Sequence, residues 1–307
     1  MKRKISVIEA LKSLVQELLI AGRIGTAHVY HSTLNRILHF NGSKPLYFEQ
    51  ITPLWLSAFQ NYLIGRQLHW NSISTYMRML RAVYLRAVDR GECSYKPRLF
   101  KGVYTGTRST VKRAISVDEL RKLSVPHPEI NAKLNKARML FLLLFMLRGI
   151  PFVALVYLRK CDLKDGVICY RRRKTGTWIS VRLDAAAVPL LEALRTQDDR
   201  SPYLFPFITS EEGSSYAQYQ KALRRFNFHL KKLSALIGCT PLSSYSARHS
   251  WATTANFCNF HQELISNAMG HSSVRVTETY FKHYSEEAID EMNRSVISLV
   301  TGENLIE

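Results

Sequence analysis

The segment from Leu264 to Tyr284 holds a histidine and a tyrosine whose spacing could serve catalysis. Apolar residues at helical spacing predict a helix that ends at Gly270, because glycine readily takes the left-handed conformation that closes a helix. His271 follows this end, and Tyr280 comes nine residues later on a second expected helix. A tyrosine hydroxyl can act as a nucleophile and a histidine can donate a proton. Taken alone, however, such residues are more often structural.

A second motif stands upstream, in the helix-forming run Ser244–Thr254, with Arg248 in its middle. Together the segments give Arg-His-Ser-Trp-Ala-Thr, then Gly-His-Ser-Ser, then a tyrosine nine residues after that histidine. This linked pair of motifs resembles the C-terminal signature of the tyrosine recombinases, the phage-integrase family. The resemblance covers nearly the whole chain but is sharp only in its C-terminal part.

The resemblance implies that phosphodiester bonds are broken through a covalent intermediate. Tyr280 would be the nucleophile, and Arg248 would clamp the non-bridging oxygens, where negative charge gathers in the transition state. Lys174, at the tip of an expected hairpin, matches the family's hairpin lysine and would protonate the departing 5′ oxygen. His271 would donate a hydrogen bond to the phosphoryl group. No acidic cluster suited to two Mg²⁺ ions is visible, so we expect no metal and no other cofactor.

Two positions depart from the family pattern. Tyr245 stands where the family usually has a histidine, although its hydroxyl can also donate to a phosphate. Pro151 stands where the family's first arginine belongs. A metal-free site needs at least two guanidinium groups, so another cation should fill that place. Arg148 is the first choice, and Arg172, expected to share a strand face with Lys174, is the second.

These departures resemble the integrases found on conjugative transposons and invertible promoters, some of which also lack that arginine. We therefore expect a site-specific recombinase that cuts and rejoins DNA through a 3′-phosphotyrosine. The family implies double-stranded DNA with inverted-repeat core sites as the partner, and a homotetramer on two DNA sites. Two alternatives stay open: a non-catalytic DNA-binding regulator on a decayed recombinase fold, and a type IB topoisomerase-like nicking enzyme. Integration, excision, inversion and dimer resolution are not distinguished.

Composition also favours a nucleic-acid partner. The chain of 307 residues carries a formal net charge of +19, far beyond what solubility needs. A membrane surface is the competing partner, but no apolar run reaches the roughly 18 residues of a spanning helix. The basic N-terminus soon carries Glu9 and Glu17, which predicts a helix and not an export signal. The cysteines are odd in number and lack CxxC spacing, which argues for a reduced, cytoplasmic protein without disulfides or zinc. With DNA as the partner, we expect it to be nucleoid-associated.

Periodicity predicts a mainly α fold with a small β-hairpin, divided into two domains. Residues 1–92 would form a helical N-terminal DNA-binding (core-binding) domain. Residues 93–114 are rich in cations but lack periodicity, so we expect a basic linker. A capping box at Ser116 opens the α+β catalytic domain, residues 115–307. Its last helix, over residues 285–300, packs on its own domain or, as the family often does, docks into a neighbour.

Two of the expected helices carry basic stripes. An isolated basic stripe is usually a solvated helix face, but the resemblance favours contact with DNA phosphates, since this family has a helical N-terminal domain that grips one side of the duplex. The residues are Arg78, Arg81 and Arg86 on the helix expected over 73–88, and Lys221, Arg224 and Arg225 on the helix expected over 216–237.

Overall fold

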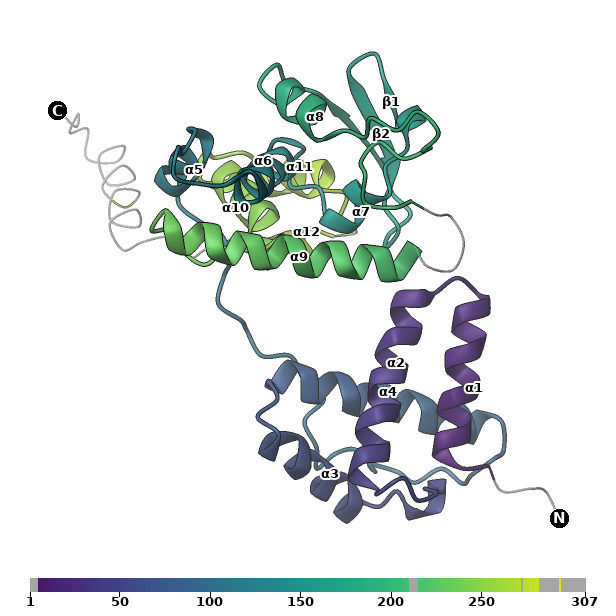
Figure 1. Ribbon diagram of the computed structural model, residues 1–307. Coiled ribbons are helices and arrows are strands. Elements are labelled where there is room, and N and C mark those ends of the chain that lie inside the picture. Colours follow the sequence, from purple (N-terminus) through teal and green to yellow (C-terminus); the bar gives the residue numbers. More distant parts are fainter. Residues whose placement is uncertain (1–4, 210–214, 272, 282–292, 294–307) are drawn as a thin grey trace. The chain divides into compact units, whose positions relative to one another are not determined.

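In the computed structural model the chain divides into two compact units, Met1–Thr110 and Val111–Glu307 (Figure 1). The structure describes residues 5–209, 215–271, 273–281 and 293. The fold is mainly helical with one small antiparallel sheet, so the predicted fold class is confirmed. The C-terminal helix expected over residues 285–300 lies outside the described residues. Within the described ranges, no helix has the length and apolar character needed to cross a bilayer.

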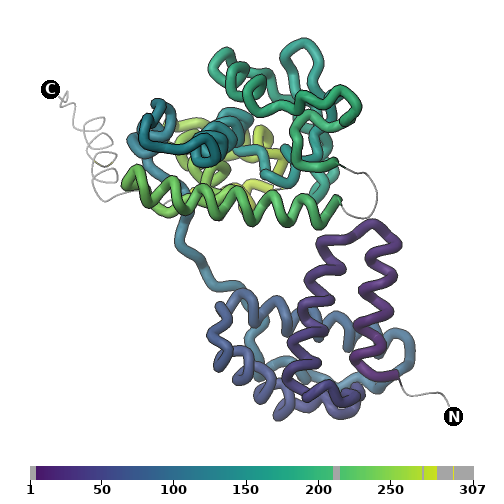
Figure 2. Tube along the Cα trace, in the orientation of Figure 1, coloured from purple at the N-terminus to yellow at the C-terminus, as the bar shows by residue number. Residues whose placement is uncertain are grey.

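Capping side chains start the helices of the N-terminal unit. The Ser6 hydroxyl accepts from the backbone N–H of Glu9 at 3.1 Å, and Thr52 accepts in the same way from Trp55. The first two helices run side by side as a hairpin, and both contact α4 (Figure 2). The elements are α1 (Val7–Ile20), α2 (Ile24–Phe40), the short 3₁₀ helix η1 (Phe48–Gln50), α3 (Pro53–Gly65) and α4 (Trp70–Asp89).

Part of the expected linker belongs to the core of this unit. Leu99, Phe100 and Val103 are buried with the apolar faces of the helices, although their spacing has no helical or strand period. Further along, Asn71 on α4 accepts from the backbone N–H of Arg108 at 2.8 Å and donates to its carbonyl at 2.9 Å. The Arg108 guanidinium lies 4.2 Å above the Trp70 ring. The chain is therefore held against α4 as far as Arg108.

A buried helix organises the C-terminal unit. Leu140, Phe141, Leu143 and Leu144 on α6 are each at most 3% exposed, and α6 contacts α8, α9 and α10 (Figure 1). The Ser116 capping box before α5 is present as predicted. The helices are α5 (Val117–Ser124), α6 (Ala132–Met146), α7 (Phe152–Val156), α8 (Val188–Leu194), α9 (Ser215–Leu236), α10 (Ser246–Phe257), α11 (Gln262–Ala268) and α12 (Val274–Glu278), with the 3₁₀ helix η2 at Lys160–Asp162.

The sheet consists of β1 (Leu163–Lys164), β2 (Val167–Arg171) and β3 (Trp178–Arg182), all antiparallel and in the order β1-β2-β3. The hairpin was predicted, but with a first strand that continues to Lys174. The strand ends at Arg171 because the Arg172 N–H donates to the Thr177 carbonyl, and the Gly176 N–H donates back to the Arg172 carbonyl, both at 2.8 Å. Arg172 is buried in this loop and Lys174 is exposed, so the expectation that they share a strand face is wrong.

The two hydrogen bonds between the Asn71 side chain and the Arg108 backbone, which we call the clasp, predict that the chain at Arg108 resists proteolysis. Asn71→Ala removes both side-chain bonds to the Arg108 backbone, so trypsin should cut after Arg108 several times faster. Cleavage after the exposed Arg113 provides an internal reference, and Asn61→Ala on α3 is the matched control. Limited proteolysis followed by mass spectrometry measures both rates. Equal cleavage of Asn71→Ala and the parent protein would show that the clasp does not hold this segment.

Candidate active site

Among the described residues of the C-terminal unit, Arg248 is the most completely buried charged group, at 1% exposure. It lies in the first turn of α10, and its guanidinium group reaches two other segments. Nη1 donates to the carbonyl of Gly149, after α6, at 2.7 Å. Nη2 donates to the carbonyl of Met269, at the end of α11, at 2.9 Å and to Nε2 of His271 at 2.8 Å. Within the described part of the chain, the Nε–H has no acceptor.

His271 is neutral and already occupied on both ring nitrogens. Arginine can only donate, so Nε2 of His271 must accept, and the ring proton therefore sits on Nδ1, which lies 2.7 Å from the hydroxyl of Thr277. Burial, followed by the charges of Arg248, Arg172 and Lys174, lowers the pKa of His271 to about 3. In this arrangement Nε2 of His271 orients Arg248. Nε2 could donate to a phosphoryl group only after it had lost its hydrogen bond from Arg248 and gained a proton.

Tyr280 lies in the turn just after α12, not within a helix as expected, and is 6% exposed. Its ring centroid lies 4.6 Å from that of His249 and 5.1 Å from that of His271. Its backbone carbonyl accepts from the Thr253 hydroxyl at 3.2 Å and from Nδ1 of His249 at 3.3 Å. Its hydroxyl lies 2.6 Å from the hydroxyl of Tyr245. The predicted nucleophile is thus held against α10, beside the predicted arginine and histidine.

Arg172 reaches the same place from the hairpin. It is 8% exposed, and Nη1 donates to the carbonyl of Gly270, the residue before His271. Burial and the charge of Arg248 lower the pKa of Arg172, while Tyr280 acts in the opposite direction. A Cβ atom on Gly270, where φ is +64°, would lie 3.1 Å from Cδ of Arg172, so this close approach depends on glycine. Arg172 is therefore a second guanidinium group at the site.

Arg148 is placed differently. It takes a left-handed backbone conformation, with φ of +56°, and Nη1 donates to the carbonyl of Ser180 on β3 at 3.2 Å. Burial raises the pKa of Tyr170 to about 12, and Arg248, Arg172 and Arg148 all oppose this rise, so Arg148 is within electrostatic reach of Tyr170 on β2. Among the described residues, none of its hydrogen bonds goes to Arg248, His271 or Tyr280. Pro151 caps α7.

Lys174 is exposed in the loop of the hairpin, outside this buried cluster. With Arg172, Arg173 and Tyr245 it lines a groove with a volume of about 480 Å³. Tyr245 lines the groove and also contacts Tyr280, so the groove lies next to the site. The lysine that was predicted to protonate the leaving group stands at the entrance of the site.

The charges of the site are unbalanced. Neither Arg172 nor Arg248 forms an ion pair with any residue that the structure describes. The described ranges also contain no group of three His, Cys, Asp or Glu residues that could hold a metal ion. A buried charge without a partner is strongly destabilising unless a ligand supplies the opposite charge. The arrangement is therefore suited to an anion next to the Tyr280 hydroxyl.

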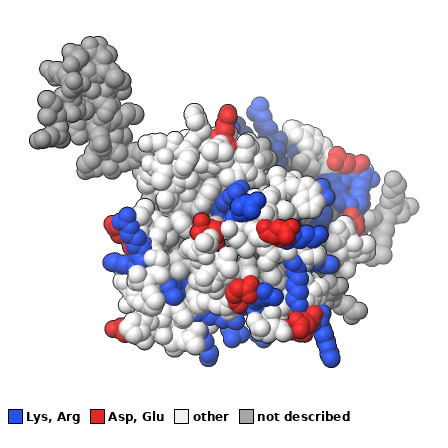
Figure 3. Space-filling view, turned by 90° about the horizontal axis from the view of Figure 1, so that it is seen from above, with Lys and Arg blue, Asp and Glu red and all other residues white. Residues whose placement is uncertain are grey.

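The predicted DNA-binding residues fall into two groups. Lys221, Arg224 and Arg225 on α9 are exposed, and so are Arg78 and Arg81 on α4. Figure 3 shows one face, on which acidic and basic side chains are interspersed over a largely uncharged surface.

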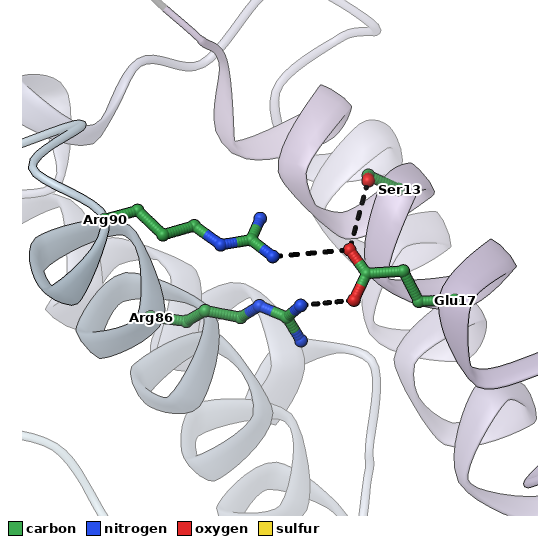
Figure 4. Close-up of polar contacts among 4 residues, drawn as sticks. All are labelled: Ser13, Glu17, Arg86 and Arg90. Atoms are coloured by element: carbon green, nitrogen blue, oxygen red, sulfur yellow. Dashed lines mark hydrogen bonds and ion pairs between the residues drawn. The ribbon is translucent and has the colours of Figure 1, made fainter. Parts of the chain in front are cut away.

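Arg86 is the exception among these residues, because its guanidinium group is engaged within the N-terminal unit. It pairs with Glu17 of α1, which also binds Arg90 and accepts from the Ser13 hydroxyl (Figure 4). The hydrogen bond and charge of Arg86, together with Arg90, hold the pKa of Glu17 below its usual range. The pair is more than a third exposed and therefore weak, so Arg86 would have to exchange Glu17 for a phosphate.

Some contacts of the site were not predicted. Thr277 accepts the Nδ1 proton of His271, and the carbonyls of Gly149, Met269 and Gly270 hold the two arginines. His249 was noted only as part of a motif, but it supports the Tyr280 ring. A backbone carbonyl cannot be recognised as an acceptor from the residue type. Gly149 and Gly270, which follow helix ends, do mark two of the turns in the sequence.

Comparisons with known proteins identify the family of both parts of the chain. The model of the phage integrase SAM-like domain matches residues 6–102, and the model of the phage integrase family matches residues 115–287. No curated protein sequence matches the chain.

Solved structures share the fold at low sequence identity. A fragment of the Tn1549 transposon integrase in complex with circular intermediate DNA is 16% identical, with a TM-score of 0.62 over 94% of this chain and 99% of that one. A lambda integrase dimer bound to a COC′ core site is 17% identical, with a TM-score of 0.65 over 92% and 80%. A lambda integrase tetramer bound to a Holliday junction is 16% identical, with a TM-score of 0.66 over 93% and 80%. The family match alone covers more than half of the residues, and the chain therefore belongs to the phage integrase family of tyrosine recombinases.

Proposed function

We propose that this protein is a site-specific recombinase, an integrase or invertase, that cuts and rejoins double-stranded DNA through a 3′-phosphotyrosine at Tyr280 without metal or ATP. The observation that carries the proposal is the pair of buried guanidinium groups, Arg172 and Arg248, without a carboxylate partner among the described residues and beside a buried tyrosine hydroxyl. A scissile phosphate supplies the missing negative charge. The cationic surroundings are favourable to the charge that develops on its oxygens during attack.

In the proposed reaction the Tyr280 oxygen attacks phosphorus and displaces the 5′ oxygen of the next nucleotide. One phosphodiester bond replaces another, so the bond energy is kept for rejoining and no nucleotide cofactor is consumed. Lys174 delivers a proton to the departing 5′ oxygen, which requires the loop at the groove entrance to lie over the bound DNA. His271 positions Arg248 through Nε2, and Thr277 holds the required tautomer.

The proposed partner is a duplex with inverted-repeat core sites, held by an N-terminal core-binding domain that includes the residues packed on it up to Arg108, a basic linker from there to residue 114 and a catalytic domain over residues 115–307. The net charge of +19 and the exposed cations of α4 and α9 support contact with phosphates. A homotetramer on two sites completes strand exchange, as expected from the lambda integrase tetramer on a Holliday junction. A soluble protein of the cytoplasm, associated with the nucleoid, fits this role.

A second candidate is a DNA-binding regulator that has lost the reaction. Pro151, at the position of the family's first arginine, is the observation that favours it. The burial of Arg172 weighs against it, because a decayed site has no need to keep an unpaired guanidinium group beside the nucleophile.

Tyr280→Phe tests the nucleophile. The variant should bind core DNA with nearly the parental affinity but form no covalent complex, because only the attacking oxygen is removed. A nicked suicide duplex analysed on a denaturing gel measures this, with Tyr95→Phe, an exposed tyrosine of the N-terminal unit, as the control. A covalent complex with Tyr280→Phe would assign the nucleophile elsewhere. A parent protein that never traps DNA would support the regulator.

The identity of the second arginine is tested by comparing two variants. Arg172→Ala should reduce single-turnover cleavage about a hundredfold to a thousandfold, the usual effect of losing one preorganised donor. Arg148→Ala should have a much smaller effect, because its guanidinium group binds the β3 backbone. Both proteins must first be shown to fold and to bind DNA. Parental cleavage by Arg172→Ala, with loss in Arg148→Ala, would reverse the assignment.

Salt dependence tests the phosphate contacts. If six to ten phosphates are contacted, affinity should fall by roughly a thousandfold or more between 50 and 200 mM salt. Replacing Lys221 and Arg225 with alanine should lower the logarithmic slope by about two, since each lost contact changes it by about 0.9. Arg121→Ala, on α5 and paired with Asp118, is the control. Fluorescence anisotropy gives the slopes, and a shallow slope for the parent protein contradicts an extended phosphate interface.

A further inference from the structure

A second tyrosine hydroxyl contacts the proposed nucleophile. Tyr245 precedes α10 and stands three residues before Arg248, so the two side chains lie one helical turn apart. Its hydroxyl lies 2.6 Å from that of Tyr280, with the ring centroids 5.8 Å apart. The distance is typical of a strong hydrogen bond between two hydroxyl groups.

The other groups around the nucleophile are already engaged. Nδ1 of His249 donates to the Tyr280 backbone carbonyl, and both nitrogens of His271 are bound to Arg248 and Thr277. Among the residues that the structure describes, only Tyr245 forms a hydrogen bond with the Tyr280 hydroxyl. This contact is therefore the one through which the fold can act directly on the attacking oxygen before DNA binds.

The direction of the hydrogen bond follows from which phenol keeps its proton. Burial, followed by the hydrogen bond and the charge of Tyr280, raises the pKa of Tyr245 to about 12. Although 40% of the Tyr245 residue is exposed, its hydroxyl lies inside the site against Tyr280. A phenol that keeps its proton is the donor when its partner becomes the anion.

We propose that Tyr245 is a further catalytic residue of this site, whose hydroxyl donates a hydrogen bond to the Tyr280 oxygen and stabilises negative charge on that oxygen as it attacks the scissile phosphate. The proposal rests on the function proposed above. It assigns the single hydroxyl proton of Tyr245 to the nucleophile, in place of the donation to a phosphate that its sequence position suggests.

The step balances with water as the acceptor of the nucleophile's proton. The bond between the Tyr280 oxygen and phosphorus forms as the bond between phosphorus and the 5′ oxygen breaks. The Tyr280 proton goes to water, and Lys174 gives one proton to the 5′ oxygen. Tyr245 keeps its own proton throughout, because it only donates a hydrogen bond. When the strand is rejoined, the same contact stabilises Tyr280 as the leaving group.

Tyr245→Phe tests the contact by removing one oxygen from a partly exposed ring. Single-turnover cleavage of a suicide duplex should fall about 10- to 100-fold, the usual range for a hydrogen bond to a charged group, while DNA affinity and the melting temperature stay unchanged. Tyr95→Phe, which removes a hydroxyl from an exposed ring of the N-terminal unit, is the control. Peptide mapping of the covalent adduct should place the DNA on Tyr280.

A fluorinated tyrosine at position 245 separates hydrogen bonding from packing. Fluorination makes the phenol more acidic and a stronger donor, so at neutral pH this variant should cleave at least as fast as the parent protein, whereas Tyr245→Phe is slow. If both variants cleave at the parental rate, the ring only packs and the proposal is overturned, while the proposed function stands. DNA attached to Tyr245 itself would also overturn it. If the parent protein forms no covalent complex, the proposed function fails first.

Discussion

The guanidinium group of Arg248 is the feature on which the site depends. It is buried at 1% exposure and carries a full charge, and the described residues offer it no carboxylate. What holds it is a set of acceptors from segments far apart in the sequence: the carbonyls of Gly149 and Met269 and the ring of His271. Because each acceptor is neutral, the group is oriented but not neutralised, which leaves its charge available to an incoming anion.

Two turns bring those acceptors into place, and both need glycine. Gly149 follows α6 with φ of +65°, and a Cβ there would lie 2.8 Å from Cα of Arg248, closer than packed atoms allow. Gly270 follows α11 with φ of +64°, and a Cβ there would meet Ile179 and Arg172. The turn at Gly149 lets the end of α6 approach the first turn of α10 at backbone distance, and the turn at Gly270 lets the end of α11 approach β3 and the hairpin loop. The site is therefore built by helix termination as much as by its side chains.

Sequence reasoning found what is local and missed what depends on how segments meet. The motif around Arg248, the end of α11 before His271 and the hairpin follow from spacing and turn residues, and the structure contains them. The end of β2 did not follow, because a run of cations after Arg171 continues the strand pattern while the hydrogen bonds of the loop stop it. That difference reverses the expected exposure of Arg172 and Lys174.

The core of the N-terminal unit also contains a segment that sequence reasoning missed. Leu99, Phe100 and Val103 have no period that distinguishes a buried segment from a linker, and they are buried only because the helices leave a surface for them. Likewise, the contact between Tyr245 and Tyr280 joins residues 35 positions apart and could not be predicted from either motif alone.

The missing arginine at Pro151 bears on how this site differs from the family pattern. Proline fixes the backbone before α7 and offers no charge, so the second cation must come from another element. Arg148 is nearer in sequence, but its left-handed backbone and its bond to Ser180 direct it to β3. Arg172 comes from the hairpin loop that also carries Lys174, and it binds the carbonyl next to His271. A guanidinium group supplied by the hairpin would tie the proposed acid and the proposed phosphate clamp to one loop. Because Arg172 is already held inside the site, docking of that loop on DNA would have to bring only Lys174 to the phosphate.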